Sequence, residues 1–465
     1  MMMHVPQSID PHIFRAYDIR GKAHAQLTEE ACLLIGKAFG SLLCERYHSE
    51  HPTVAVGRDM RTHSPALERA VVEGLKSAGC HVFAIGETPS PVSYFTIMHR
   101  RLDGSVQVTA SHNPKEDNGL KLQIRNAEAF AGDDIQELRR RVETGKFLLG
   151  KGSVETIDAI TPYLALLKEQ FQGVGKGLEV AVDCGNGVTG PVNIAAFKQT
   201  GCTVIELFTD PDGTFPNHPA DPSKHATLGD LQRTVRERKA AIGFAFDGDG
   251  DRLGVVDETG AIRSSDDILL LLARDYLSRN PKKPVIFTVS NSSTLETEIR
   301  KWSGEPIMCK VGHSFVEHAM REYEAGLGGE QSGHFFLGEV GYGYDDALVA
   351  ALQVLVILQK SGKPFSSLFA DFPKVYQAHE LRPGCPDSEK TRIIRAVTKH
   401  FAKDYPVNTL DGARIDFGDG AWAGIRQSNT SPCLSVCIEA RSPKKLAAVE
   451  GEVLSHLRTY PEIQL

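Results

Sequence analysis

The chain has 465 residues, more than one hydrophobic core can organise, so we expect three or four domains. Its formal net charge of −7 argues against nucleic acid or an anionic membrane as the main partner, because both require basic surfaces. The nine cysteines form no CxxC pair, and residues 1–10 lack the apolar core of a signal peptide. We therefore predict a cytoplasmic protein that binds neither nucleic acid nor membrane.

Strand-like and helix-like runs alternate along the first half of the chain. The pattern predicts helices over residues 27–46 and 64–78, with strands over 53–57 and 81–85. It then predicts a second set of elements: a strand at 178–183, a helix at 192–200, and strands at 203–208, 242–246 and 253–256. The glycine turn at 184–188 could bind an anion, but many structural turns look the same, and we favour a structural role.

A third unit of the same kind runs from a turn at 257–260 through a strand at 285–289 to an apolar helix at 347–358, which is too short to span a membrane. A helix at 388–400 and a strand at 433–439 then indicate a smaller α+β domain. We thus predict an α/β protein with three related mixed-sheet α/β domains before the α+β domain. The predicted boundaries are 1–153, 154–256, 257–370 and 371–465.

Ser111 lies in a segment rich in turn-forming residues, 108–115, and could be an ordinary loop serine. A second segment, Asp247-Gly-Asp-Gly-Asp-Arg252, supplies what a phosphorylated serine would need: three carboxylates for Mg²⁺ and a guanidinium for phosphate oxygens. A serine hydrolase is disfavoured, because Gly-x-Ser-x-Gly is absent around Ser111 and His112 is too close in sequence to be assumed a positioned base. The two segments together predict metal-assisted phosphoryl transfer.

The aspartate spacing also fits the start of an EF-hand calcium loop. However, Arg252 stands at the sixth position, where that loop needs glycine, and the flanking runs read as strands rather than helices. A solvated acidic turn is disfavoured because three aspartates between apolar strands repel one another unless a cation offsets them. Farther along, one bidentate cation and three short donors in a tight turn are typical of a phosphate-binding loop: Arg426, Ser428, Asn429 and Thr430.

Five segments resemble the α-D-phosphohexomutase superfamily, most closely its bacterial phosphomannomutase/phosphoglucomutase group, in the family's order: 14–21, 108–115, 247–252, 329–334 and 426–432. The resemblance implies a heart-shaped enzyme of four domains, each contributing one loop to a central cleft. It implies that hexose 1-phosphate and 6-phosphate, of mannose, glucose or both, are interconverted through a phosphoserine and a hexose 1,6-bisphosphate. Mg²⁺ would be the cofactor, glucose 1,6-bisphosphate the activator, and the protein a monomer or weak dimer.

The resemblance also assigns catalytic roles. Lys121 would be a general acid or base, with a pKa lowered by Arg20 and a cationic cleft. His334 would handle a proton at the sugar, and Arg252 would bind phosphate oxygens. Ser111 would carry the phosphoryl group, and Mg²⁺ would be held by the phosphoserine with three carboxylates: Asp247, Asp249 and Asp251.

Substrate would be bound by a set of mostly polar side chains: Tyr17, Arg20, His313, Glu330, Ser332, Arg426, Ser428, Asn429 and Thr430. Ser290 and Glu317 stand where lysine is common in the family, and the spelling around Gln331 is shared with phosphoglucosamine mutases. Tyr17 and Thr109 follow the mannose and glucose enzymes, which we favour. The alternatives are a phosphoglucosamine mutase, a catalytically silent sugar-phosphate binding protein and a metal-dependent phosphatase.

Overall fold

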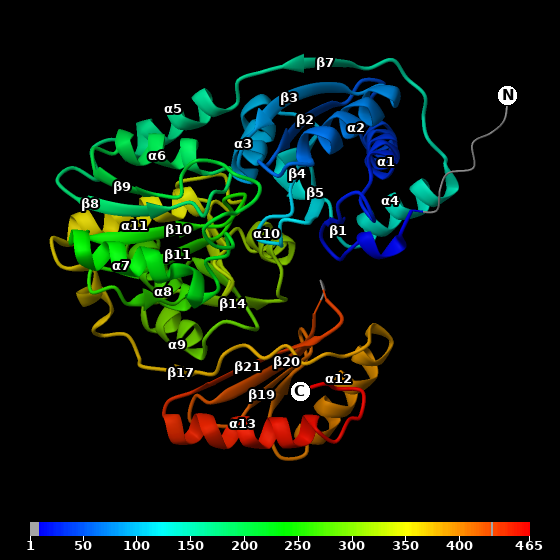
Figure 1. The fold of residues 1–465 in the computed structure, drawn as a ribbon. Helices are drawn as coiled ribbons and strands as arrows, with labels where there is room; N and C mark the ends of the chain where they lie inside the picture. The colour runs from blue at the N-terminus through cyan, green and yellow to red at the C-terminus, as the bar shows by residue number, and fades with distance from the viewer. Residues whose placement is uncertain (1–8, 429–430) are drawn as a thin grey trace. The chain divides into compact units, whose positions relative to one another are not determined.

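The computed structural model describes residues 9–428 and 431–465 (Figure 1). The chain forms two compact units, each of which is described by itself. The first contains the residues up to Ile268 together with Ser332–Leu368, and the second contains Leu269–Gln331 and Phe369–Leu465. None of the helices in the described part of the chain combines the length and apolar character that a membrane span requires.

The first unit begins with a mixed sheet in which parallel strands form the centre and antiparallel strands one edge. Its strands, in spatial order, are β1 (Ile19–Lys22), β5 (Asp117–Ile124), β4 (Gly104–Val108), β2 (Thr53–Arg58), β3 (His81–Glu87) and β7 (Ser153–Thr156), with β6 (Glu128–Ala129) beside β5. The helices of this region are α1 (Glu29–Tyr47), α2 (Ser64–Ser77), α3 (Ser90–Arg100) and α4 (Asp133–Thr144).

Helices α1 and α2 lie side by side next to this sheet (Figure 1) and share its apolar core. Their close approach depends on facing glycines. A Cβ atom built on Gly74 would lie 2.3 Å from the carbonyl oxygen of Leu33, and one built on Gly36 would lie 2.6 Å from that of Val71. Any side chain at either position would therefore push the two helices apart.

The second sheet of this unit has the order β12 (Ile262–Arg263), β11 (Leu253–Asp257), β10 (Ile242–Phe246), β8 (Glu179–Asp183), β9 (Thr203–Leu207). Because β10 and β11 pair antiparallel, the aspartate segment between them is a tight turn. The unit also contains α5 (Ile160–Phe171), α6 (Gly190–Gln199), α7 (Gly229–Arg238), β16 (Phe335–Leu337) and α11 (Ala347–Ser361). Helix α8 (Ser265–Arg279) starts in this unit and continues into the second.

The second unit contains three parallel strands, β14 (Glu305–Cys309), β13 (Pro284–Thr288) and β15 (Leu327–Gly329), with α9 (Ser293–Lys301) and α10 (His313–Glu322). An antiparallel sheet follows, in the order β17 (Tyr376–Gln377), β21 (Leu434–Ala440), β20 (Trp422–Gln427), β19 (Ala413–Asp416), β18 (Val407–Asn408). Helices α12 (Asp387–Phe401) and α13 (Pro443–Leu457) cover one face of it (Figure 1) and close a separate apolar core. The predicted C-terminal α+β domain is confirmed.

Candidate functional site

Ser111 lies in the loop between β4 and β5, where its backbone is held in an unusual conformation. The residue is buried and has a φ of +51°, in the left-handed region that side chains other than glycine rarely adopt. Its backbone N–H donates to Thr109 Oγ1 at 2.9 Å, and its carbonyl oxygen accepts from the Arg61 guanidinium at 2.9 Å. Its hydroxyl donates to Asp247 Oδ2 at 2.5 Å, although the two residues are 136 positions apart.

The turn from Asp247 to Arg252 wraps around its own first carboxylate. Asp247 Oδ1 accepts hydrogen bonds from the backbone N–H groups of Gly250, Asp251 and Arg252 at 2.9, 3.1 and 3.2 Å. A Cβ atom on Gly248 would lie only 2.4 Å from the carbonyl oxygen of Ser111. Glycine at this position therefore lets the turn reach the serine loop, and the structure brings together the two segments that the sequence pointed to.

The three aspartates of the turn fit a hard divalent cation. One carboxylate oxygen of each lies within 4.8 Å of those of the other two, and all three residues are buried. Within the described residues, Asp249 Oδ1 and Asp251 Oδ1 are buried oxygens that receive no hydrogen bond. Burial raises the pKa of Asp247 well above its ordinary value, and the neighbouring Asp251 and Asp249 raise it further. Carboxylate oxygens are the ligands that Mg²⁺ prefers, and a bound cation would offset the repulsion among these buried carboxylates.

Lys121, on β5, contacts these carboxylates directly. Its ammonium group lies 2.6 Å from Asp249 Oδ2 and also donates to Asp251 Oδ2. Burial by itself would lower the pKa of Lys121, but Asp249 and Asp251 outweigh burial and raise the pKa well above its ordinary value. The expected lowering of this pKa by Arg20 is thus wrong for this structure, because two carboxylates rather than a cation face the ammonium. In this state Lys121 is suited to donate a proton rather than to accept one.

Arg20, on β1, lies against the serine loop. Its Nη1 donates to the carbonyl oxygen of Ala110 at 3.0 Å and to Asn113 Oδ1 at 2.8 Å, while its Nε pairs with Asp18 at 2.6 Å. Its side chain is largely buried. Arg20 therefore places a fixed positive charge beside the loop that carries Ser111.

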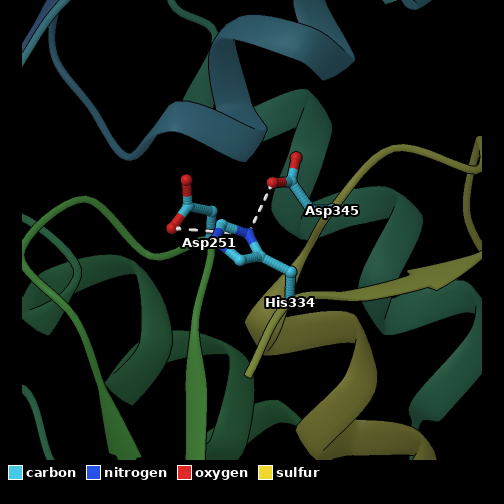
Figure 2. A group of neighbouring side chains, drawn as sticks. All are labelled: Asp251, His334 and Asp345. Atoms are coloured by element: carbon cyan, nitrogen blue, oxygen red, sulfur yellow. Dashed lines mark hydrogen bonds and ion pairs between the residues drawn. The ribbon is translucent and has the colours of Figure 1, made fainter. Parts of the chain in front are cut away.

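His334 joins the aspartate turn to a residue that the sequence did not single out. Figure 2 shows its imidazole between Asp251 and Asp345: Nδ1 lies 2.8 Å from Asp345 Oδ2 and 3.9 Å from Asp251 Oδ1. On the other side of the ring, Arg252 Nε donates to Nε2 at 2.9 Å. Since a guanidinium can only donate, Nε2 accepts and Nδ1 carries the hydrogen, which is the tautomer of a neutral base.

His112 is a further imidazole at the serine. Its Nδ1 lies 3.0 Å from Ser111 Oγ. Burial lowers the pKa of His112 well below its ordinary value, and Arg252 and Arg20 lower it further, so the ring is neutral. From the sequence alone, His112 was not expected to be a positioned base because it adjoins Ser111. In the structure the two side chains are in contact, and the backbone of Ser111 is left-handed.

The remaining candidate residues are divided between the units. Tyr17 and Ser332 belong to the first unit and are half-buried. In the second unit His313 is the first residue of α10, and Glu330 Oε2 accepts from the backbone N–H of Gly312 at 3.0 Å. Of the two departures from the family pattern, Ser290 is buried, and the buried Glu317 pairs with Arg321 at 3.9 Å.

The predicted phosphate-binding loop follows β20 in the second unit. Arg426 is the penultimate residue of that strand, and Ser428 Oγ accepts from Arg382 at 3.1 Å. Lys390, on α12, was not singled out by sequence, yet its buried ammonium donates to the carbonyl oxygens of Ser428 at 2.9 Å and Ser431 at 2.6 Å. Asn429 and Thr430 lie outside the described residues.

Comparison with known proteins supplies the family. Four models of phosphoglucomutase/phosphomannomutase domains match in order: α/β/α domain I over residues 11–149, domain II over 161–260, domain III over 264–376 and the C-terminal domain over 380–456. A phosphomannomutase/phosphoglucomutase of Pseudomonas aeruginosa is 39% identical over 447 residues, covering 96% of this chain and 95% of that protein. A phosphoglucomutase of Neisseria gonorrhoeae is 36% identical, covering 98% and 99%.

Other relatives widen the range of sugars and supply a solved structure. A probable phosphoglucosamine mutase of Methanopyrus kandleri is 33% identical, covering 96% of this chain and 97% of that protein. The crystal structure of a phosphoglucomutase/phosphomannomutase family protein from Burkholderia thailandensis superimposes with a TM-score of 0.90 at 38% identity, covering 97% and 98% of the two chains. This chain therefore belongs to the phosphoglucomutase/phosphomannomutase family of the α-D-phosphohexomutase superfamily, as its motifs predicted.

Proposed function

We propose that this hexose-phosphate mutase converts mannose and glucose 1-phosphates to the 6-phosphates through a phosphorylated Ser111 and a hexose 1,6-bisphosphate. The observation that carries the proposal is the 2.5 Å hydrogen bond from Ser111 Oγ to Asp247, within a buried group of three carboxylates. A serine placed there can carry a phosphoryl group whose negative charge a divalent cation held by these carboxylates would balance.

In the first half-reaction, a sugar hydroxyl attacks the phosphorus of phosphoserine and the bond to Ser111 Oγ breaks. The hydroxyl proton passes to His334 Nε2 once Arg252, which donates to that nitrogen in this structure, has turned to the substrate phosphate; the other ring nitrogen stays bonded to Asp345. Lys121 can protonate the departing Oγ. In the second half-reaction the bisphosphate returns its other phosphoryl group to Ser111, and the proton transfers run in reverse.

Ser111, once phosphorylated, would hold Mg²⁺ together with Asp247, Asp249 and Asp251. When bound, the ion would draw negative charge from the phosphoryl oxygens. Arg20 and Arg252 would bind the same oxygens as fixed cations. Glucose 1,6-bisphosphate would be the activator, because it can phosphorylate a serine that has lost its phosphoryl group.

The substrate-binding residues remain a proposal that rests on the family pattern. Glu330 and Ser332 would bind sugar hydroxyls, and Tyr17, Arg20 and His313 would be further substrate-binding residues. The phosphate that is not reacting would be held by the loop residues Arg426, Ser428, Asn429 and Thr430. Support for that role comes from Lys390, whose ammonium donates to two carbonyl oxygens of the loop and also pairs with Asp387 at 2.5 Å. The nine unpaired cysteines fit a reducing compartment, and since one chain carries every motif, a monomer or weak dimer would suffice.

The test is a substrate panel, in which kcat/KM is measured for the 1-phosphates of mannose, glucose and glucosamine with Mg²⁺ and a trace of glucose 1,6-bisphosphate. We expect comparable values for mannose and glucose. A clear preference for glucosamine 1-phosphate would reassign the sugar and direct attention to Gln331 and Ser290. Turnover of none of them would indicate a silent binding protein, and phosphate release without sugar product a phosphatase.

The nucleophile is tested by Ser111→Ala, which should lower kcat on the order of 10⁴-fold or more while leaving the melting temperature within the range of the control. The matched control is Ser105→Ala, which removes another buried serine hydroxyl, bonded to Gln123, on the neighbouring strand β4. Intact mass after incubation with glucose 1,6-bisphosphate should show one added phosphoryl group in the control and none in Ser111→Ala. Full activity of Ser111→Ala would refute the phosphoserine mechanism.

A further inference from the structure

Arg61 is a fully buried arginine beneath the loop that carries Ser111. All five of its side-chain N–H groups are accounted for by acceptors. Nη1 donates to the carbonyl oxygens of Pro114 at 2.6 Å and Asp117 at 3.1 Å, and Nη2 donates to those of Ser111 at 2.9 Å and Asn113 at 2.7 Å. The fifth, on Nε, pairs with Asp59 Oδ2 at 3.1 Å.

These contacts concentrate on one short piece of backbone. Four of the five bonds end on carbonyl oxygens between residues 111 and 117, which is the connection from β4 to β5. The flat face of the guanidinium also lies 5.1 Å from the ring of Phe215. A planar, rigid fork of donors fixes the relative positions of these carbonyl groups in a way that a single ammonium cannot.

Asp59 extends the same network to the other side of the Ser111 peptide. Its Oδ2 accepts from Thr109 Oγ1 at 2.8 Å, and Thr109 Oγ1 in turn accepts the backbone N–H of Ser111 at 2.9 Å. Its Oδ1 accepts from Ser64 Oγ at 2.5 Å and from the backbone N–H of Arg61 at 3.0 Å. Arg61 therefore holds the C=O of Ser111 directly, and Asp59 holds its N–H through the hydroxyl of Thr109.

The backbone conformation of Ser111 needs such a grip. A residue with a side chain keeps a φ of +51° only where its surroundings determine that conformation. Turning the peptide to an ordinary conformation would redirect the hydroxyl away from Asp247, to which it now donates at 2.5 Å. The carbonyl oxygen of Ser111 is also where Gly248 of the aspartate turn comes closest to the loop, so moving it would disturb both segments.

We propose that Arg61 is a positioning residue for the phosphorylated serine: it holds the Ser111 backbone in the left-handed conformation from which the hydroxyl meets Asp247. Arg61 touches neither the hydroxyl nor the carboxylate and acts through the loop backbone. The inference rests on the proposed phosphoserine mechanism. It assigns to the segment after β2 a share in catalysis that the family motifs used above do not include.

The test compares Arg61→Lys, which keeps the positive charge and loses the fork, with Val106→Ala. Val106 is a buried core residue of β4 whose truncation destabilises the same domain without touching the loop network. Three quantities are measured at a temperature at which both variants are folded: kcat, KM, and the rate at which glucose 1,6-bisphosphate phosphorylates Ser111, followed by intact mass.

For Arg61→Lys we expect kcat and the phosphorylation rate to fall by roughly 10- to 100-fold with KM within about twofold, because a small misplacement of a reacting group can cost about 100-fold. Val106→Ala should keep both rates within about twofold of wild type despite a lower melting temperature. If Arg61→Lys behaves like Val106→Ala, Arg61 is merely structural and the proposal is wrong.

A second variant covers the case in which Arg61→Lys fails to fold. Thr109→Val keeps the shape of the side chain and removes the acceptor for the Ser111 N–H; it should show the same loss of kcat at unchanged KM, and an unchanged kcat would overturn the proposal. Failure of the proposed function is distinguishable, because the wild-type protein itself would then gain no phosphoryl group. In that case the positioning role falls with it.

Discussion

Asp249 shows how the charges beside Ser111 are balanced at the level of single residues. Its Oδ2 accepts from Lys121 at 2.6 Å and from Ser90 Oγ at 2.6 Å, while its Oδ1 receives no hydrogen bond from the described residues. Because Oδ2 is held by two hydrogen bonds and Oδ1 by none, Oδ1 is suited to bind a cation. The same oxygen would otherwise be a buried acceptor whose desolvation is uncompensated.

Replacing Asp249 with Asn should therefore weaken Mg²⁺ activation by more than the roughly 10- to 100-fold typical of residues that only support a metal ligand. The measurement is the Mg²⁺ concentration for half-maximal activity after chelation of bound metal. Asp221→Asn, at a buried aspartate that pairs with Lys224, serves as the control and should leave this concentration unchanged. An Asp249→Asn variant that is fully active without added Mg²⁺ would exclude Asp249 as a ligand.

The residues that sequence reasoning found differ from those it missed in a physical way. Ser111 and the aspartate turn are visible because each segment carries an unusual local composition whose chemistry is complementary to the other. Asp345, Arg61 and Lys390 act through contacts that exist only after folding, and no other segment of the sequence carries a chemistry that points to them. The one usable signal was the charge-rich segment Arg58-Asp59-Met60-Arg61 at the end of a largely buried strand.

At the level of elements, the strands and helices with clear periodicity were predicted well. The strand predicted at 242–246 is β10, and the helix predicted at 347–358 is the core of α11. Helix α6 begins two residues earlier than predicted, where Pro191 opens the first turn. Helix α3 was not predicted because its first eight residues are all buried and leave no polar face to reveal a helical period, and β7 because all four of its residues are exposed.

Helix α11 begins at a carboxylate whose titration should affect stability. Asp346 caps the helix by accepting from the backbone N–H of Val349 at 3.0 Å and also accepts from Tyr163 at 2.8 Å. Burial raises the pKa of Asp346 from 3.8 to about 6. Since the folded protein holds this proton more tightly than the unfolded chain, the stabilisation is complete below pH 4 and is lost as the pH rises towards 6.

Asp346→Asn should therefore gain stability relative to wild type as the pH rises, by about 3 kcal/mol in the limit set by the shift. Asn can still cap the helix through its carbonyl oxygen, so the two proteins should differ least in acid. Scanning calorimetry between about pH 4 and about pH 7 measures the difference in melting temperature. A difference that does not change with pH would mean that Asp346 keeps an ordinary pKa.

Helix α12 supports the proposed phosphate-binding loop through one residue, Lys390. Lys390→Met removes the ammonium that donates to Ser428 and Ser431, so we expect KM for the sugar 1-phosphate to rise about tenfold, with a smaller effect on kcat. Lys399→Met, at an exposed position of the same helix, is the matched control and should leave KM unchanged. Equal KM values for the two variants would show that the loop does not depend on α12.

At the scale of the whole molecule, the formal net charge is negative, while individual cations contact the two loops proposed to bind phosphate. The chain carries a formal net charge of −7, yet Arg20 contacts the Ser111 loop, and Lys390 and Arg382 contact the proposed phosphate-binding loop, each with a carboxylate partner of its own. A dianionic substrate is repelled by the first and attracted by the second. Salt screens both interactions, and we expect the attraction to dominate because these cations would contact the substrate phosphates directly.

Raising the salt concentration should therefore lower kcat/KM for a sugar phosphate, by about threefold or more between roughly 0.01 and 0.3 M NaCl. The value of kcat at saturating substrate should change less, since binding is then complete. If the net charge of the molecule governed the encounter, kcat/KM would instead increase with salt. Initial rates at low and saturating substrate over the salt series separate the two cases.

The spacing of Ser111 from its partners also sets an order of events during synthesis. Its hydroxyl needs Asp247, and the imidazole beside that turn needs Asp345, which is made far later. At about 5 to 20 residues per second, a ribosome takes on the order of ten seconds or more to pass from one end of this site to the other. Under the proposed mechanism each new molecule is synthesised without a phosphoryl group on Ser111. It must then be phosphorylated by hexose 1,6-bisphosphate that other molecules of the enzyme have released.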